Sequence, residues 1–285
     1  MYRKLTLLII TLVLTSPLLI YDNTDGADPL LSHLQVMMET GGKIGIDHPM
    51  DGTSLLRASM EGKITGTGYT RTNPLPSSWD LEYSGLYCDV YVASSETVSA
   101  SLLQDLADLF DSDIYPIATD WFHPESPPEK IDFRIYDLGD GENGVGGFFI
   151  RSPAHRNDLY VDSKDIAVSD EIVAHEFQHL LHYDLDPDES TWLDEGLADL
   201  SIRLTLGPNT PAVQSHINAL EAYPDNDLLE WDEGIPPNYY ETIADYGMAY
   251  SFVTYIADHY GGKNTISDIV ASDLNSIESV DSALE

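Results

Sequence analysis

Two short stretches of the chain constrain its fold and chemistry most, because both carry side chains that can bind a metal. The first is HEFQH, which runs from His175 to His179, and the second is WLDEGLADL, which contains Glu195 and Asp199. Residues four apart lie on the same face of a helix, one turn from each other. We therefore expect two helices, one presenting both histidines and the other presenting both carboxylates.

The spacing of these residues predicts a single metal site. Two histidines at this spacing, with a Glu directly after the first, form the pattern of zinc hydrolases, whose catalytic zinc has three protein ligands and a water. Fifteen residues separate His179 from Glu195, enough to end one helix, turn at the sequence DPD and begin an antiparallel helix. Glu195 is then the third ligand, and Asp199 is placed to accept the free N–H of a ligating histidine. The alternatives are two surface histidines on an acidic helix and, for Asp199, a solvated carboxylate.

The chain before these helices alternates apolar and polar residues in the way that strands do. We expect strands at residues 86–93, 130–138, 148–151 and 158–162, with shorter ones near residues 63–69. A helix is expected between the first two of the longer strands. Ser99 or Ser101 can cap its start, and Pro116 is expected to break it because proline lacks an amide hydrogen.

Helical signals dominate from Ser169 onward. Ser169, which two acidic residues follow, is expected to cap the HEFQH helix. The next helix is expected to run from Ser190 or Thr191 to the Gly-Pro pair that begins at Gly207. Each helix carries a leucine-rich stripe opposite its ligand-type face, so each is predicted to have an apolar back and a polar front.

These patterns predict an α+β fold. Residues 28–80 are rich in Gly, Thr, Ser and Pro and are interpreted as a loosely structured lead-in. Residues 81–183 form a sheet-rich subdomain that ends in the HEFQH helix. Residues 184–285 form a mainly helical subdomain that carries the third ligand.

The N-terminus has the features of a secretory signal. Arg3 and Lys4 precede an apolar run from Leu5 to Ile20, and small residues follow, ending at Ala27. This order of basic, apolar and small residues predicts a signal peptide over residues 1–27, cleaved after Ala27, and a secreted protein with no stable membrane association. An uncleaved N-terminal membrane anchor is the alternative.

Charge and cysteine content narrow the partners and the means of stabilisation. The chain has 49 acidic and 13 basic residues, a formal net charge of -36, which disfavours nucleic acid and anionic lipid as partners. Cys88 is the single cysteine, so no intramolecular disulfide can form. Its strand-like surroundings favour a buried, inert thiol.

HEFQH followed by WLDEGLADL resembles the gluzincin metallopeptidases, the thermolysin-like clan in which a downstream Glu completes a zinc site. More narrowly, the chain resembles the secreted hyicolysin-like peptidases. The resemblance extends to the stretch DYGMAYSFVTYIADHYGG, and we place it over about residues 60–285. One departure concerns Asp194, which stands where an Asn is common before the ligand Glu.

The resemblance implies a zincin-like fold and a set of roles. His175, His179 and Glu195 would bind Zn²⁺, and Glu176 would be the general base that activates a water for attack on a polypeptide substrate, more as an endopeptidase than an aminopeptidase. The alternative is a noncatalytic extracellular or cell-surface protein with a structural zinc. Glu176 argues against it, because a structural site gains nothing from a base beside the metal.

Some further residues are weaker candidates. The resemblance directs attention to the helix after Glu195 for an oxyanion donor, and we choose Tyr246, ahead of Tyr239 and Tyr240 on an expected preceding loop; ordinary amphipathic tyrosines are the alternative. Residues 148–150 could pair with an extended substrate, or form an ordinary half-buried strand. The loops at 137–144 and 184–190 carry oxygen ligands that could hold Ca²⁺, although solvated loops are favoured.

Overall fold

The computed structural model describes residues 73–139, 146–150, 155, 157–229, 231 and 239–285. The described residues belong to one compact unit. The predicted signal peptide, the strands near residues 63–69 and most of the lead-in lie outside the described residues.

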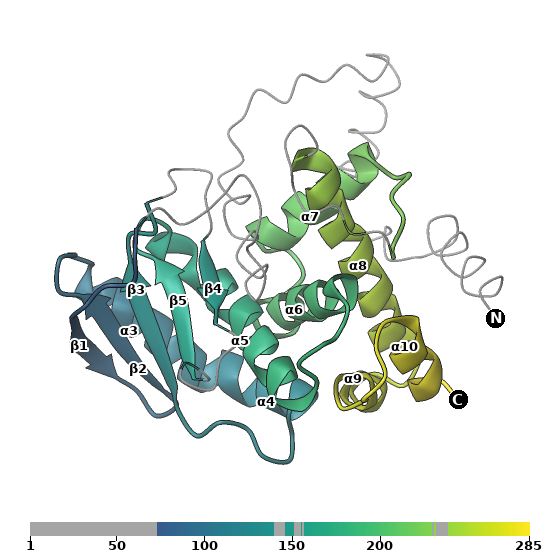
Figure 1. Cartoon of the computed structure of the whole chain (residues 1–285), viewed down its shortest axis with the longest axis horizontal. Coiled ribbons are helices and arrows are strands. Elements are labelled where there is room, and N and C mark those ends of the chain that lie inside the picture. The colour runs from purple at the N-terminus through teal and green to yellow at the C-terminus, as the bar shows by residue number, and fades with distance from the viewer. Residues whose placement is uncertain (1–72, 140–145, 151–154, 156, 230, 232–238) are drawn as a thin grey trace, which may run out of the picture. The chain divides into compact units, whose positions relative to one another are not determined.

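The described residues form one mixed sheet with helices packed against it and beside it (Figure 1). Its strands are β1 (Trp79–Ser84), β2 (Cys88–Ala93), β3 (Ile131–Tyr136), β4 (Gly147–Phe149) and β5 (Asp158–Asp162). The strand order is β1-β2-β3-β5-β4. The inner pairs are parallel and the two outer pairs antiparallel. The predicted α+β class is therefore confirmed.

Four of the five strands coincide with predicted ones, and β1 was not predicted. Its sequence, WDLEYS, alternates apolar and polar residues as a strand does, but most of its residues are exposed and two of them are acidic. It lies at the edge of the sheet, where charged and exposed side chains are common. β1 begins at Trp79, two residues before the expected start of the sheet-rich part.

The predicted break at Pro116 is wrong. The helix after β2 continues past Pro116 and is only widened in the turn just before it. Helix α3 (Ala100–Leu109) continues through one π-helical turn, Phe110–Ile114, into α4 (Tyr115–Phe122). Proline has no amide hydrogen and its ring crowds the carbonyl four residues earlier. That carbonyl belongs to Ser112, inside the wider turn, so the chain accommodates Pro116 without ending the helix.

The remaining helices follow β5 and carry the candidate site. They are α5 (Ser169–Leu185), α6 (Thr191–Leu206), α7 (Pro211–Ala222), α8 (Tyr239–His259), α9 (Lys263–Val270) and α10 (Ile277–Ala283). Helix α5 packs against β4 and β5 on one side and against α6 on another, so it lies between the sheet and the later helices (Figure 1). Helix α8 packs on both α6 and α7.

Aromatic side chains hold α5 against the sheet. The ring of Phe110, in the π-helical turn, lies edge-on to Phe133 of β3 at 4.9 Å and to Phe177 of α5 at 5.0 Å. All three rings are fully buried. Edge-to-face pairs of this kind stabilise a core beyond the area they bury. Phe177 lies in the middle of HEFQH, so this packing positions the motif directly.

The start of α5 differs slightly from prediction, whereas both ends of α6 agree with it. Ser169 is the first residue of α5 and not its cap, because a 3-10 turn at Ile166–Val168 leads directly into the helix. The Ser169 hydroxyl donates to the Ile166 carbonyl at 2.9 Å instead. Helix α6 starts and ends as predicted, with Ser190 before it and Gly207 after it at φ 100°.

The polar fronts predicted for α5 and α6 are not exposed. Both helices are buried around most of their circumference, including every candidate ligand. The apolar stripes face the core as expected, but neighbouring elements also cover the opposite faces. Periodicity alone identified the stripe and could not show what covers the other side.

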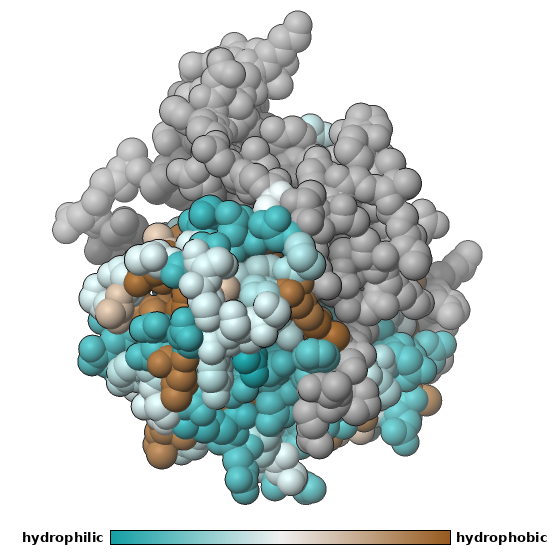
Figure 2. All heavy atoms as spheres, turned by 60° about the vertical axis from the view of Figure 1, so that its left-hand side comes forward, coloured by the Kyte–Doolittle hydropathy of each residue, from teal (hydrophilic) through white to brown (hydrophobic). Residues whose placement is uncertain are grey.

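On the face shown in Figure 2, the described residues are mainly hydrophilic, with small separate hydrophobic patches. Across the residues that the structure describes, no helix combines the length and the apolar character needed to cross a membrane. Cys88 is fully buried, as predicted, and burial raises the pKa of its thiol.

Candidate metal centre

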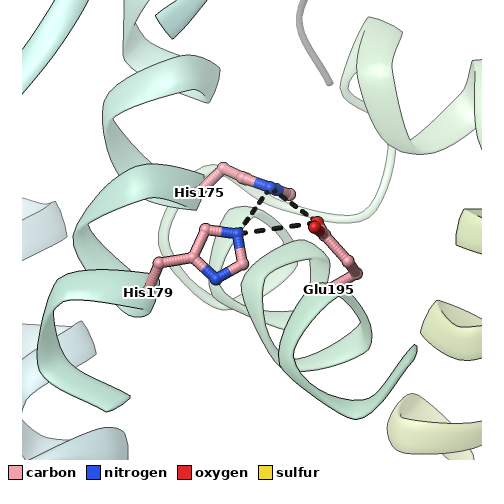
Figure 3. A group of neighbouring side chains, drawn as sticks. All are labelled: His175, His179 and Glu195. Carbon is pink, nitrogen blue, oxygen red and sulfur yellow. Dashed lines mark hydrogen bonds and ion pairs between the residues drawn. The ribbon is translucent and has the colours of Figure 1, made fainter. Parts of the chain in front are cut away.

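Three ligand-type side chains converge between α5 and α6. His175 and His179 project from one face of α5 toward Glu195 on α6 (Figure 3). The Nε2 atoms of the two histidines lie 3.1 Å apart. Glu195 Oε2 lies 3.2 Å from Nε2 of His175 and 3.5 Å from Nε2 of His179. The structure thus brings together the three residues that the spacing predicted.

These three separations have the size that one metal ion requires. Zinc binds nitrogen and carboxylate oxygen at about 2.0 Å with tetrahedral geometry, so neighbouring ligand atoms lie about 3.3 Å apart. The observed edges of 3.1, 3.2 and 3.5 Å match this value. The three side chains are at most 2% exposed. This buried group can hold a metal ion.

Two carboxylates lie on the far sides of the imidazole rings. Asp199 Oδ1 is 3.2 Å from Nδ1 of His175, and Asp194 Oδ2 is 3.0 Å from Nδ1 of His179. A carboxylate accepts hydrogen bonds, so each Nδ1 carries a proton and each Nε2 presents its lone pair. Two lone pairs and a carboxylate oxygen then face one point, an arrangement that requires a cation or a proton to be favourable.

The pKa values of these groups reflect that requirement. Burial lowers the pKa of His175, but hydrogen bonds to Asp199 and Glu195 outweigh burial and raise it to about 9. Burial also opposes the charge on His179, yet Asp194 and Glu195 raise its pKa well above the usual value. Burial raises the pKa of Asp199, but His216 and His175 lower it to about 2. The surroundings of both histidines therefore favour positive charge.

His216 on α7 is a residue that sequence analysis missed. Its Nδ1 lies 2.5 Å from Asp199 Oδ2, so Asp199 contacts two histidines at once. Helix α7 is held in place by Glu171, whose carboxylate accepts a hydrogen bond from the Ala212 amide at 2.8 Å. Nothing in the sequence around His216 distinguishes it from an ordinary buried histidine, and its partner lies 17 positions away.

Glu176, next to the first histidine, is buried, and neither of its carboxylate oxygens has a hydrogen-bond partner among the described residues. Burial raises its pKa, and the two neighbouring histidines act in the opposite direction. Its side chain lies close to β4, because a Cβ added at Gly147 would be 3.8 Å from Glu176 Cγ. A buried carboxylate with both oxygens free is costly unless it has another purpose.

Glycines permit the close helix packing that positions the ligands. A Cβ on Gly196, next to Glu195, would lie 2.9 Å from the Ala249 carbonyl oxygen of α8. A Cβ on Gly247 would lie 2.2 Å from the His216 carbonyl oxygen of α7. Such distances are shorter than real contacts allow, so α8 reaches both neighbours only because these residues are glycine.

Tyr246 lies beside the metal ligands but is enclosed by rings. Its ring centroid is 6.4 Å from that of His175, 4.9 Å from that of His216 and 4.8 Å from that of Trp231, and the residue is 1% exposed. Tyr239 and Tyr240 were predicted to precede this helix on a loop, and that prediction is wrong. They are the first two residues of α8.

A second group with ligand-type chemistry lies at the end of α5. It contains His182, which sequence analysis left out, and Asp186 and Glu189 from the acidic loop at 184–190. The other acidic loop, at 137–144, lies mostly outside the described residues. There, Asp137 accepts a hydrogen bond from the Gly139 amide and pairs with Lys164.

Comparison with known proteins does not identify a family for this chain. A scan against protein-family models and a search of curated proteins returned no match to this chain. The argument for function therefore depends on the geometry and chemistry of the site.

Proposed function

We propose that this protein is a zinc-dependent metallopeptidase of the gluzincin type, with a zincin-like fold. His175, His179 and Glu195 bind the metal. The observation that carries the proposal is the unpartnered, buried carboxylate of Glu176 immediately beside three convergent metal-ligand atoms.

The donor set supports zinc over other common ions. Imidazole nitrogen suits zinc, copper, iron and nickel, whereas calcium and magnesium prefer oxygen ligands alone. Two neutral imidazoles and one carboxylate together carry one negative charge, which attracts a divalent cation. Three protein ligands leave one tetrahedral position for a water or a substrate oxygen, as catalytic zinc sites require.

Glu176 acts as the general base. When bound, zinc lowers the pKa of a coordinated water to about 7 and polarises a carbonyl group. In this reaction Glu176 would take the proton of the water that attacks the peptide carbonyl carbon, and would then donate that proton to the leaving amine nitrogen. Burial raises its pKa, which makes the Glu176 carboxylate a stronger base than an exposed glutamate.

Asp199 and Asp194 position the ligands. Asp199 accepts a hydrogen bond from Nδ1 of His175, and Asp194 pairs with Nδ1 of His179; these contacts fix the ring orientations and increase the basicity of each Nε2. Both residues are buried, so these contacts act in a medium where charge interactions are strong. Tyr246 is the proposed donor to the negative oxygen that develops in the transition state.

The substrate is a polypeptide. β4 lies at one edge of the sheet and passes close to Glu176 at Gly147. An extended peptide can add to such an edge through main-chain hydrogen bonds, which would align its scissile bond with the base. We include in this proposal that the protein is secreted through its N-terminal signal, and that it acts as an endopeptidase.

A noncatalytic protein with a structural zinc is the second candidate. The burial of all three ligands favours it, because structural sites are closed whereas catalytic sites keep an open position. Glu176 separates the two candidates, since only the catalytic one needs it.

The test combines metal analysis with digestion of an unstructured protein. The proposal expects bound zinc, hydrolysis that a chelator abolishes, and restoration of hydrolysis by added zinc. Glu176→Gln should keep the zinc and lose hydrolysis by several orders of magnitude, because the ligands remain and the base is gone. A zinc-loaded wild type that digests nothing, or a Glu176→Gln variant with full activity, would refute the proposal.

A further inference from the structure

A second set of buried metal-ligand side chains lies where α5 ends and the connection to α6 begins. One ligand atom from each of His182, Asp186 and Glu189 lies within 4.8 Å of the other two. The three residues are 1%, 6% and 8% exposed, respectively. None of them belongs to the group formed by the HEFQH histidines and Glu195.

The direction of the two acidic side chains is unusual for a surface loop. Pro187 and Asp188, between them in sequence, are exposed, so water lies within reach of the connection. Asp186 and Glu189 nevertheless turn inward, toward His182. Burying two carboxylates together is unfavourable unless a positive charge compensates them.

His182 has the tautomer that metal binding needs. Its Nδ1 lies 2.8 Å from Asp194 Oδ1, and because a carboxylate accepts, Nδ1 carries the proton. The Nε2 atom is buried and has no hydrogen-bond partner in the part of the chain that the structure describes. Oδ2 of Asp186 is likewise buried and without a partner. A lone pair on nitrogen and a carboxylate oxygen, both unsatisfied, thus occur in one small group.

Glu189 is held by one oxygen and has the other available. Its Oε1 accepts hydrogen bonds from the Ser190 hydroxyl at 2.8 Å and from the Ser276 amide at 2.7 Å. Its Oε2 has a single long contact, 3.4 Å from the Ser279 hydroxyl. The bonds to Oε1 fix the Glu189 carboxylate against the start of α10. They orient Oε2 and leave it able to bind a metal ion.

From these contacts we propose that His182, Asp186 and Glu189 form a second binding site, for a divalent transition-metal ion of the zinc class. The two carboxylates match the charge of a divalent ion. The imidazole favours zinc over calcium, which takes six to eight oxygen ligands. A protonated His182 could compensate the two carboxylates in place of a metal ion. Its Nε2–H would then be buried without an acceptor among the described residues.

The two sites share one residue. Asp194 contacts Nδ1 of His179 with one oxygen and Nδ1 of His182 with the other. Asp194 therefore orients a ligand of each site. The second ion also joins the end of α5 to the segment that Glu189 ties to α10, so its role is structural and its loss should lower the melting temperature.

The experiment measures metal content in the full chain, so its outcome does not depend on hydrolysis. The protein is stripped with a chelator, equilibrated with Zn²⁺, freed of excess metal and analysed. The wild type should hold two zinc ions per chain, and Asp186→Asn should hold one. Asp184→Asn is the matched control, because Asp184 is exposed, lies two positions away and is outside the group; it should hold two.

Further variants assign each ion and guard against misfolding. His175→Ala should also hold one ion, and its combination with Asp186→Asn should hold none. If Asp186→Asn fails to fold, Glu189→Gln gives the same measurement, because its amide oxygen can still accept the bonds that Oε1 accepts. Equal zinc content in the wild type and in whichever of these two variants folds would overturn the second site, as would occupancy by Ca²⁺ in preference to Zn²⁺. Loss of activity in Glu176→Gln tests the proposed peptidase separately.

Discussion

Asp194 Oδ2 lies 3.0 Å from Nδ1 of His179, in the fully buried space between α5 and α6. This relationship gives a physical reason for an aspartate, and not an asparagine, directly before Glu195. Burial opposes the charge of Asp194, but His179 and His182 hold its pKa well below the usual value, so it is ionised. A full negative charge strengthens His179 as a ligand more than a neutral amide would.

Asp194→Asn should therefore weaken metal binding at the first site. We expect a loss of about 10- to 100-fold in zinc affinity, the size typical for removal of a residue that orients a ligand. Affinity is measured by competition with a chelating dye. Asp105→Asn, an exposed change of the same type on α3, is the control and should leave affinity unaltered.

Glu195→Gln should remove the zinc that the HEFQH histidines bind, because a neutral amide is a much weaker ligand than a carboxylate. Zinc analysis after dialysis checks this result. The circular dichroism spectrum should remain that of the wild type, since the two side chains have nearly the same shape. Retention of this zinc with full activity would show that the gluzincin assignment is wrong.

Tyr246→Phe should keep zinc and substrate affinity but lower kcat by about a hundredfold, or about 2.7 kcal/mol of transition-state stabilisation. The ring contacts with His175 and His216 persist in the variant because only the hydroxyl is removed. Steady-state kinetics compares it with Tyr250→Phe, a buried tyrosine on the same helix. An unchanged kcat would remove Tyr246 from the mechanism.

The stability of the chelator-treated protein should depend on pH in a defined direction. The pKa of His175 is about 9 in the folded protein and about 6.5 in an unfolded chain. Protonated His175 thus stabilises the fold fully below about pH 6.5, and this contribution is lost as the pH rises through about 9. With zinc bound, the ion takes the place of the proton and the loss should disappear. Urea unfolding at pH 6, 7.5 and 9, with and without zinc, measures both curves; parallel curves would contradict this account.

Gly247→Ala should destabilise the protein, because the added Cβ would meet the His216 carbonyl oxygen at 2.2 Å. Separating α7 from α8 costs about 1–3 kcal/mol, as overpacking in a core does. The same shift would move His216 relative to Asp199. Urea denaturation gives the free energy of unfolding, and a stability equal to that of the wild type would show that α7 adjusts freely.

Local patterns of the sequence determined much of this protein. The spacing of His175 and His179 predicted a shared helix face, and their Nε2 atoms indeed lie 3.1 Å apart. The strand at residues 158–162 and the end of α6 at Gly207 also occur where they were predicted. Such features depend on residues close together in the chain, where the periods of helix and strand set which side chains are neighbours.

Only the tertiary structure decided which polar groups surround the ligands. His182 and His216 join the two buried aspartates through contacts between different helices, and no sequence period connects them. The wide turn before Pro116 was hidden for the same reason. Contacts between distant segments depend on how closely helices approach and at what angle, and packing throughout the core sets both.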